Sequence, residues 1–285
     1  MTAAHVPAAT DVRVTEEWLA LREPADAEAR STQLVRRLQQ MHVASAEHVI
    51  HDLGCGSGSM GRWLAPMLDG PQHWVLHDRD ADLLDRAAGD PPGAAADGRP
   101  VSVRTRQGDL SGLTPDDLAP ATLVTASALL DMMTADEVEH LVHLCVAAGC
   151  PALLTLSVTG RVELTPSDAL DARLGAAFDD HQRRTVGGRA LLGPDAVRVA
   201  VQRFRDLGAE VVTRPSPWRL DPRRPGLTAQ WLAGWVGAAC EQRPELTAAA
   251  AEYHARRAEQ LADGRLGVMV HHLDLLAVPA AGASR

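Results

Sequence analysis

HDLGCGSGSMG, residues 51–61, decides the fold that the sequence predicts. It follows a short, mostly apolar stretch at 48–53 that is typical of a strand, and it leads into residues 60–67, whose Met, Trp and Leu spacing gives a helix one buried stripe. A glycine-rich turn between a strand and a helix lets the backbone approach a ligand closely. The sequence therefore predicts a ligand site at the end of this strand.

The glycines of this loop fit two ligand-binding patterns. Counted from Gly56, they match the dinucleotide fingerprint, and Asp78 lies about the expected 20 residues further on, which makes a nicotinamide-dependent oxidoreductase one alternative. Counted from Asp52, an acidic residue is followed by glycine at every second position: Gly54, Gly56 and Gly58. The first register extends the strand to Gly56 and buries Asp52 unpaired in the sheet, which costs several kcal/mol, so the second register is favoured.

Strand and helix patterns alternate around the loop. Further strands are expected at 74–78, 101–106, 122–126 and 151–158, with helices at about 80–88 and 137–148. This alternation predicts an α/β fold with a parallel sheet covered on both faces. Two more strands are expected at 209–214 and 269–278, separated by some fifty mostly helical residues. Residues 15–43 have a helical pattern, which Pro24 is expected to split into a short helix and a longer one.

The register from Asp52, together with Asp78 at the end of the second strand and Asp109 and Leu110 after the third, resembles the class I S-adenosylmethionine-dependent methyltransferases. In that family the second of these acidic residues holds the ribose hydroxyls, and the third, with its neighbour, binds the adenine edge. The resemblance implies a Rossmann-like class I methyltransferase fold: a seven-stranded, mostly parallel sheet with helices on both faces and an antiparallel last strand.

The resemblance also implies a cofactor. S-adenosyl-L-methionine would be the methyl donor and S-adenosyl-L-homocysteine the product, held by Asp52, Gly54, Gly56, Gly58, Asp78, Asp109, Leu110 and Ser127. Segments such as LLGPDA, RPSPW and AGWVGAACEQRPEL are similar to an actinobacterial group of small-molecule methyltransferases. A protein of this fold that binds the cofactor without transferring methyl is a further alternative.

One departure from the family pattern, together with the N-terminal segment, suggests where the methyl acceptor binds. We expect an N-terminal helical cap at 1–46, and a methyltransferase domain at 47–285 with a helical insertion at about 218–266. The family usually joins its last two strands by a short connection. We therefore expect the cap and the insertion to bind the acceptor, with O-, N- or C-methylation all possible.

Charged residues in these regions are candidates for catalysis and substrate binding. Asp131 and His181 are candidate general bases, because a positioned carboxylate or an imidazole can take a proton from an acceptor. Helix capping by Asp131 and a solvated charged helix end around His181 are the alternatives. An acidic substrate would be held by arginines of the cap and of the charged stretch at 178–184, namely Arg22, Arg30, Arg183 and Arg184. Intrahelical ion pairs are the alternative in the cap.

The amino-acid composition excludes several other classes of enzyme and binding partner. All 28 residues counted as Lys+Arg are arginines. Without lysine the chain has no Schiff-base amine, no Walker-A phosphate loop and no kinase lysine. The net charge of −9, without an arginine block longer than two, disfavours nucleic acid as a partner. Four cysteines without metal-ligand spacing and the lack of a long apolar run predict a cytoplasmic protein without metal or membrane contact. The resemblance implies that it acts on a small molecule, and monomer and homodimer both stay open.

Overall fold

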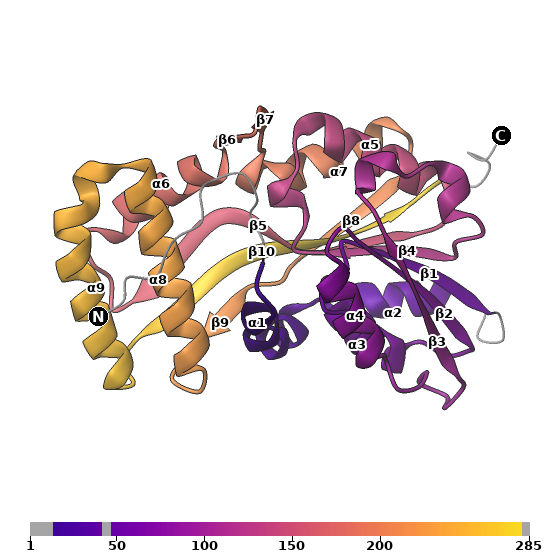
Figure 1. Cartoon of the computed structure of the whole chain (residues 1–285), viewed down its shortest axis with the longest axis horizontal. Helices are drawn as coiled ribbons and strands as arrows, with labels where there is room; N and C mark the ends of the chain where they lie inside the picture. The colour runs from indigo at the N-terminus through magenta and orange to yellow at the C-terminus, as the bar shows by residue number, and fades with distance from the viewer. Residues whose placement is uncertain (1–13, 42–46, 281–285) are drawn as a thin grey trace.

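The structure is a computed structural model that describes residues 14–41 and 47–280 (Figure 1). Residues 1–13, 42–46 and 281–285, which belong to the predicted cap and to the end of the predicted domain, lie outside the described residues. Within the described ranges no helix combines the length and the apolar character that a membrane span requires.

One mixed sheet forms the centre of the molecule. Its parallel part runs, in spatial order, through β3 (Val101–Gln107), β2 (Gln72–Asp78), β1 (His48–Leu53), β4 (Leu123–Ser127) and β5 (Ala152–Thr165). Antiparallel to β5 lies β10 (Gly267–Val278), whose other edge pairs with β8 (Glu210–Pro215). The predicted parallel sheet with an antiparallel last strand is therefore confirmed.

The sheet has one strand more than the seven predicted. The short strand β9 (Trp218–Leu220) pairs with Val268–Val270 of β10. It forms because β10 is long and β8 covers only its residues 273–278. The strand expected to end at residue 158 also continues, as β5, to Thr165, where it keeps its pairing with β10.

Helices cover both faces of the parallel part, as predicted. On one face α2 (Thr32–Met41), α3 (Ser59–Leu64) and α4 (Ala81–Gly89) enclose a core that contains Ile50 and Trp74. On the other face α5 (Ala135–Ala147) and α7 (Ala196–Asp206) pack over Leu53 and Val124. Figure 1 shows these two layers below and above the strands. Alternate residues of the central strands thus point into two different cores, which is typical of a doubly covered sheet.

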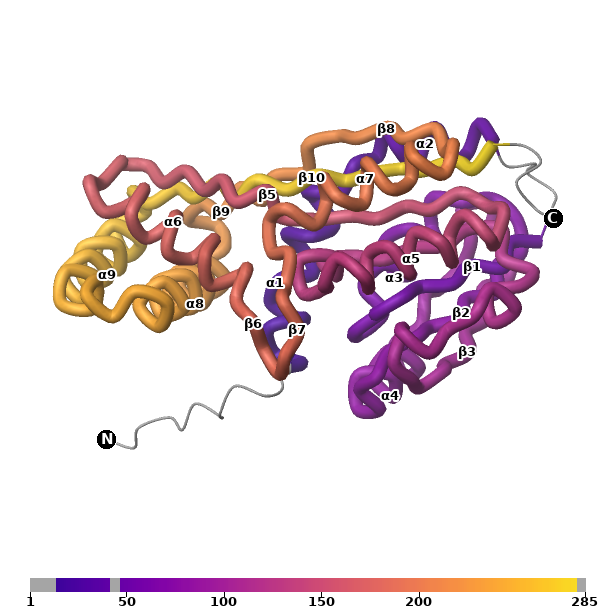
Figure 2. Tube along the Cα trace, turned by 90° about the horizontal axis from the view of Figure 1, so that it is seen from above, coloured from indigo at the N-terminus to yellow at the C-terminus, as the bar shows by residue number. Residues whose placement is uncertain are grey.

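A second, helical lobe packs on the far ends of β5 and β10 (Figures 1 and 2). It consists of α6 (Asp171–Gln182), α8 (Pro225–Gln242) and α9 (Thr247–Ala262), and a separate core binds it to β9 and β10. The lobe therefore includes α6 as well as helices from the predicted insertion. The small hairpin of β6 (Thr185–Val186) and β7 (Arg189–Ala190) follows α6.

The N-terminal helices break at a different place from the one predicted. α1 (Glu16–Ala29) continues through Pro24 and ends at Arg30, whose extended backbone (ψ 138°) turns the chain into α2. The prediction from Pro24 was wrong, because a helix tolerates an internal proline when tertiary packing offsets the lost hydrogen bond. Here Ala25 is buried in the core of the lobe and Asp26 binds the indole of Trp218.

A buried ion pair joins two helices of the lobe and gives a stability prediction. Asp171 Oδ1 of α6 accepts hydrogen bonds from Arg257 Nη2 (2.6 Å) and from the Tyr253 hydroxyl (2.7 Å), both of α9. Asp171→Asn leaves the guanidinium of Arg257 buried without its counter-ion and is expected to lower the free energy of unfolding by about 3 kcal/mol. Tyr253→Phe removes one hydrogen bond and is expected to cost about 1 kcal/mol. Urea unfolding of both variants measures the difference, and equal costs would contradict it.

Candidate functional site

The glycine loop lies at the carboxyl edge of the sheet. β1 ends at Leu53, and the loop leaves the sheet through Gly54, Gly56 and Gly58, whose φ angles are +65°, +54° and +84°. A Cβ atom at Gly54 would lie 3.0 Å from Leu129 Cδ1, so this position also lacks room for a side chain. Because β1 pairs with β2 on one side and with β4 on the other, the loop lies where the strand order reverses, which is the usual ligand site of open α/β sheets.

Asp78, the last residue of β2, is fixed against this loop. Its Oδ2 accepts the backbone N–H of Gly56 at 2.8 Å, and its Oδ1 accepts the N–H of Asp80 at 3.0 Å. Asp80 in turn caps α4 through the N–H of Asp82. A carboxylate oxygen that accepts one hydrogen bond has a lone pair for another, so Asp78 remains a possible acceptor for a ligand hydroxyl.

Asp52 is a buried carboxyl group at the end of β1. Its Oδ1 accepts a hydrogen bond from Thr125 Oγ1 of β4 at 2.7 Å, whereas its Oδ2 is buried with no hydrogen-bond partner among the described residues. Burial raises the pKa of Asp52 to about 7. The strand ends one residue later, at Leu53, and does not continue to Gly56 as the dinucleotide register requires. A cationic ligand group would lower the cost of ionising this carboxyl.

Arg30 and Ser127 meet on the other side of the loop. Arg30 is 2% exposed, and its Nη2 donates to Ser59 Oγ at 3.1 Å and to Ser127 Oγ at 3.0 Å. Ser127, at the end of β4, also accepts from Thr155 Oγ1 at 3.0 Å. The structure thus places Arg30, predicted as a substrate residue, and Ser127, predicted as a cofactor residue, in direct contact.

Asp109 and Leu110 follow β3 at the same edge of the sheet. Asp109 is exposed and caps a short 3-10 helix, η2 (Leu110–Gly112), by accepting from the N–H and the hydroxyl of Ser111. The hydroxyl contact of Ser111, followed by its backbone contact, lowers the pKa of Asp109. Leu110 is half-buried against the core under α5.

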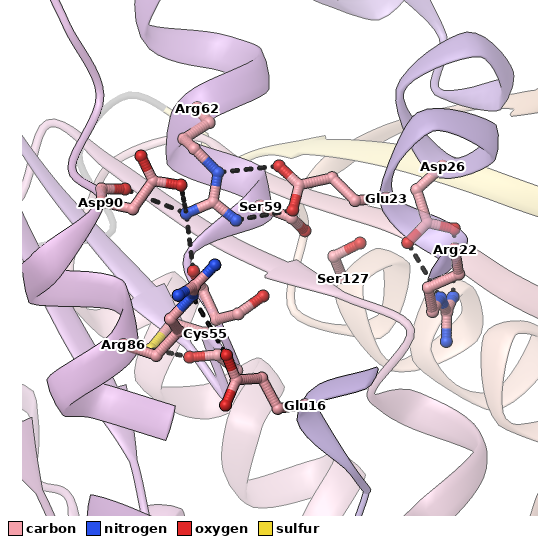
Figure 3. Close-up of polar contacts among 12 residues, drawn as sticks. Glu16, Arg22, Glu23, Asp26, Cys55, Ser59, Arg62, Arg86, Asp90 and Ser127 are labelled. Atoms are coloured by element: carbon pink, nitrogen blue, oxygen red, sulfur yellow. Dashed lines mark hydrogen bonds and ion pairs between the residues drawn. The ribbon is translucent and has the colours of Figure 1, made fainter. Parts of the chain in front are cut away.

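α1 covers the glycine loop and is tied by ion pairs to α3 and α4 (Figure 3). The Arg62 guanidinium of α3 binds both carboxylate oxygens of Glu23, with distances of 2.7 and 2.6 Å. Arg86 of α4 approaches Glu16 at 3.3 Å. A Cβ atom at Gly56 would lie 3.3 Å from Leu19 Cδ1. The helix therefore covers the loop with an apolar side chain flanked by two ion pairs.

Arg22, on the same helix, has a carboxylate partner. Its guanidinium pairs with Asp26 one turn later at 2.9 Å and lies 4.8 Å above the ring of Trp218. This is the intrahelical ion pair that the sequence left open as the alternative to substrate binding. The other candidate arginine of the cap, Arg30, makes no such pair with any described residue.

Asp131 lies just beyond β4, in the 3-10 helix η4 (Leu130–Met132). Burial raises its pKa to about 6, and its Oδ2 accepts from Gln182 Nε2 of α6 at 3.4 Å. The alternative role as a helix cap is wrong, because Thr134 caps α5 in a capping box with Glu137. Asp131 thus connects the ligand edge of the sheet to the helical lobe.

The remaining candidates lie at the end of α6, in polar contacts of the lobe. His181 Nε2 lies 3.1 Å from Glu241 Oε2 and its Nδ1 lies 3.1 Å from Arg184 Nη1, so both ring nitrogens are engaged. Burial and the charge of Arg184 lower the pKa of His181, against the opposing effect of Glu241. Arg183 pairs with Asp195 at 2.7 Å. The structure therefore brings Asp131, and not these three residues, to the edge where the glycine loop lies.

Sequence reasoning missed several residues of the site. Arg62, Glu23, Leu19 and Thr125 were not candidates, although they fix the loop or its carboxyl group. The position of Arg62, four residues after Gly58 on the helix that follows the loop, was a usable signal. The contacts of Leu19 and Glu23 depend on how α1 packs, and the sequence contains no local pattern for that.

Comparisons with known proteins give limited information. No protein-family model matches the chain, and a comparison with curated proteins finds no match. Among solved structures, the cyclopropane synthase MmaA2 of Mycobacterium tuberculosis is 13% identical, with 93% of this chain and 94% of that chain covered and a TM-score of 0.48. YcgJ of Bacillus subtilis is 13% identical, with 88% and 100% covered and a TM-score of 0.49.

A third solved structure is a SAM-dependent methyltransferase of Geobacter sulfurreducens in complex with S-adenosyl-L-homocysteine. It is 17% identical, with 93% of this chain and 99% of that chain covered and a TM-score of 0.42. At these identities and TM-scores the likenesses carry no functional argument for this chain.

The conformation of the loop gives a stability prediction. Gly54→Ala places a Cβ at a positive φ and 3.0 Å from Leu129, and it is expected to lower the free energy of unfolding by about 2 to 3 kcal/mol. Gly98→Ala is the matched control, because Gly98 has φ +81° but no neighbouring atom within 4 Å, and it is expected to cost about 1 kcal/mol. Urea unfolding compares the two. Equal costs would mean that Leu129 moves aside freely.

The raised pKa of Asp52 gives a pH prediction. An unfolded aspartate loses its proton near pH 4, whereas folded Asp52 holds its proton to a pH of about 7, so between these values the folded state binds more protons. The contribution of Asp52 to stability therefore falls as the pH rises through this window, by at most about 4 kcal/mol. Asp52→Asn is expected to remove this part of the pH dependence. Urea unfolding at several pH values checks it, and parallel curves for the two proteins would rule it out.

Proposed function

We propose that this chain is a class I methyltransferase that uses S-adenosyl-L-methionine and acts on a small molecule. The observation that carries the proposal is the convergence of Asp52, the positive-φ glycine loop and Asp78 at the reversal of the strand order. The sheet order, with an antiparallel strand between the fifth strand and β8, agrees with what the sequence resemblance implied.

The chemistry of these residues fits such a donor. S-adenosyl-L-methionine supplies an electrophilic methyl group on a sulfonium, next to an adenosine and a zwitterionic amino acid. Asp78 would accept from the ribose hydroxyls, and Asp109 with Leu110 would border the adenine. Asp52 has a buried oxygen without a partner, which suits a cationic group. The loop turns through glycines at positive φ, which lets its backbone approach a ligand closely.

For the transfer, the chain itself has to hold the acceptor in line and keep water away. Asp131 is the candidate base, because its carboxyl group, with a pKa of about 6, is mostly ionised at neutral pH and can accept a proton from a hydroxyl or ammonium acceptor. Its contact with Gln182 supports an acceptor side between β4 and the helical lobe. His181, Arg183 and Arg184 are a weaker choice, since their side chains are occupied by Glu241, Asp195 and His181, respectively.

The end of β1 disfavours a nicotinamide-dependent oxidoreductase. The dinucleotide register needs a strand that continues to Gly56, and β1 stops at Leu53. In both a methyltransferase and an oxidoreductase of this fold, Asp78 is the acidic residue expected to hold a ribose, so Asp78 alone does not distinguish the two enzymes. A ligand-binding measurement distinguishes them.

Calorimetry tests the proposal. The wild-type chain is expected to bind S-adenosyl-L-homocysteine with micromolar-range affinity and to show no comparable binding of NAD or NADP. Asp78→Asn is expected to weaken binding about 10- to 100-fold, because an amide lacks the charge that strengthens a hydrogen bond to a ribose hydroxyl. Asp97→Asn, at an exposed turn before β3, is the matched control and should leave the affinity unchanged. Tight NAD binding without S-adenosyl-L-homocysteine binding would overturn the proposal.

A further inference from the structure

Arg30 is a buried cation at the glycine loop. It ends α1, and its side chain reaches the first residue of α3 and the end of β4. The guanidinium also lies 5.4 Å from the ring centre of Trp63. Only 2% of the residue is exposed, and burial lowers its pKa. A charge placed this deeply needs a partner of opposite charge or a full set of hydrogen bonds.

The structure provides neither within the described ranges. The hydrogen bonds of Arg30 all go to uncharged oxygens, those of Ser59 and Ser127, and its Nε has no partner there. The two nearby carboxylates besides Asp52 are already engaged. Asp26 binds Arg22 and the indole of Trp218, and Asp274 accepts from two backbone N–H groups and a serine hydroxyl.

Asp52 presents the opposite charge at the same edge of the sheet. It lies on β1 opposite Thr125 of β4, two residues before Ser127, which Arg30 contacts. Its Oδ2 is buried without a partner, as is Arg30 Nε, and the structure shows no ion pair between the two side chains in the part of the chain it describes. The carboxyl group of Asp52 and the guanidinium of Arg30 thus lie next to the same loop, and each has a polar atom without a hydrogen-bond partner in the described residues. This arrangement suits a ligand that carries both charges.

We propose that Arg30 binds the α-carboxylate of the donor's amino-acid end, while Asp52 lies toward its α-ammonium. This inference rests on the proposed function and removes Arg30 from the residues expected to bind the acceptor. The extended backbone of Arg30 ends α1, and its side chain lies against Ser59 and Ser127, next to the loop that α1 covers. A guanidinium can hold a carboxylate through two parallel hydrogen bonds, with a geometry that no neutral side chain reproduces.

The experiment compares two ligands that differ only in the amino-acid end. S-adenosyl-L-homocysteine carries both charges, and methylthioadenosine has the same adenosine and thioether without them. Calorimetry of Arg30→Gln is expected to show about 10- to 100-fold weaker binding of the first ligand and unchanged binding of the second. Arg30→Lys keeps the charge and is expected to give a smaller loss, again for the first ligand only. Arg22→Gln is the matched control, because Arg22 already has Asp26, and it should leave the ratio of the two affinities unchanged.

The outcomes separate the possible roles of Arg30. If Arg30→Gln weakens both ligands equally, or neither, in protein whose circular dichroism shows it to be folded, the inference is overturned and Arg30 only joins α1 to the loop. Should Arg30→Gln not fold, the same comparison is made with Arg30→Lys. If the wild-type chain binds neither ligand, the proposed function itself fails, and this inference fails with it. If the wild-type chain binds methylthioadenosine but not S-adenosyl-L-homocysteine, both are overturned, whereas undiminished S-adenosyl-L-homocysteine binding by folded Arg30→Gln overturns the inference alone.

Discussion

The sharp turn after Leu53 is the constraint on which the site depends. β1 lies inside the sheet, with a parallel strand on each side, and its chain leaves the sheet directly after Leu53 and enters α3 at Ser59. Glycines at positive φ make that turn without steric cost. The turn presents the Gly56 N–H to Asp78 and starts α3 beside Arg30. A side chain at these positions would displace Leu129 or Leu19, so the loop, β4 and α1 depend on one another.

Buried charged side chains have different partners in the two halves of the molecule. In the helical lobe the guanidinium of Arg257 is paired with Asp171, although its Nε has no hydrogen-bond partner in the described structure. At the glycine loop Asp52 and Arg30 are equally buried, yet the described structure gives neither of them an ion pair, and each keeps a polar atom without a partner. Folding alone favours the first arrangement. Departures from it are expected where a protein binds a ligand, and both departures lie at the reversal of the strand order.

The sequence was sufficient for the features that depend on local patterns. Alternating strand and helix signals predicted the sheet and its two helical layers, and the glycine spacing located the loop and Asp78 at its edge. Features that depend on tertiary packing were missed. The strand β9 forms because β10 has a free edge, α1 continues through Pro24 because its residues pack on the lobe, and Glu23 and Leu19 reach Arg62 and the loop only once α1 lies across it. No local signal in the sequence reports such contacts.

A crystal structure of the chain with S-adenosyl-L-homocysteine tests the central claim most directly, because it locates the ligand without knowledge of the acceptor. The account predicts the ribose hydroxyls at Asp78, the adenine beside Asp109 and Leu110, and the amino-acid end between Asp52 and Arg30. A ligand bound elsewhere, or in the reverse orientation with its adenine against Arg30, would contradict the account.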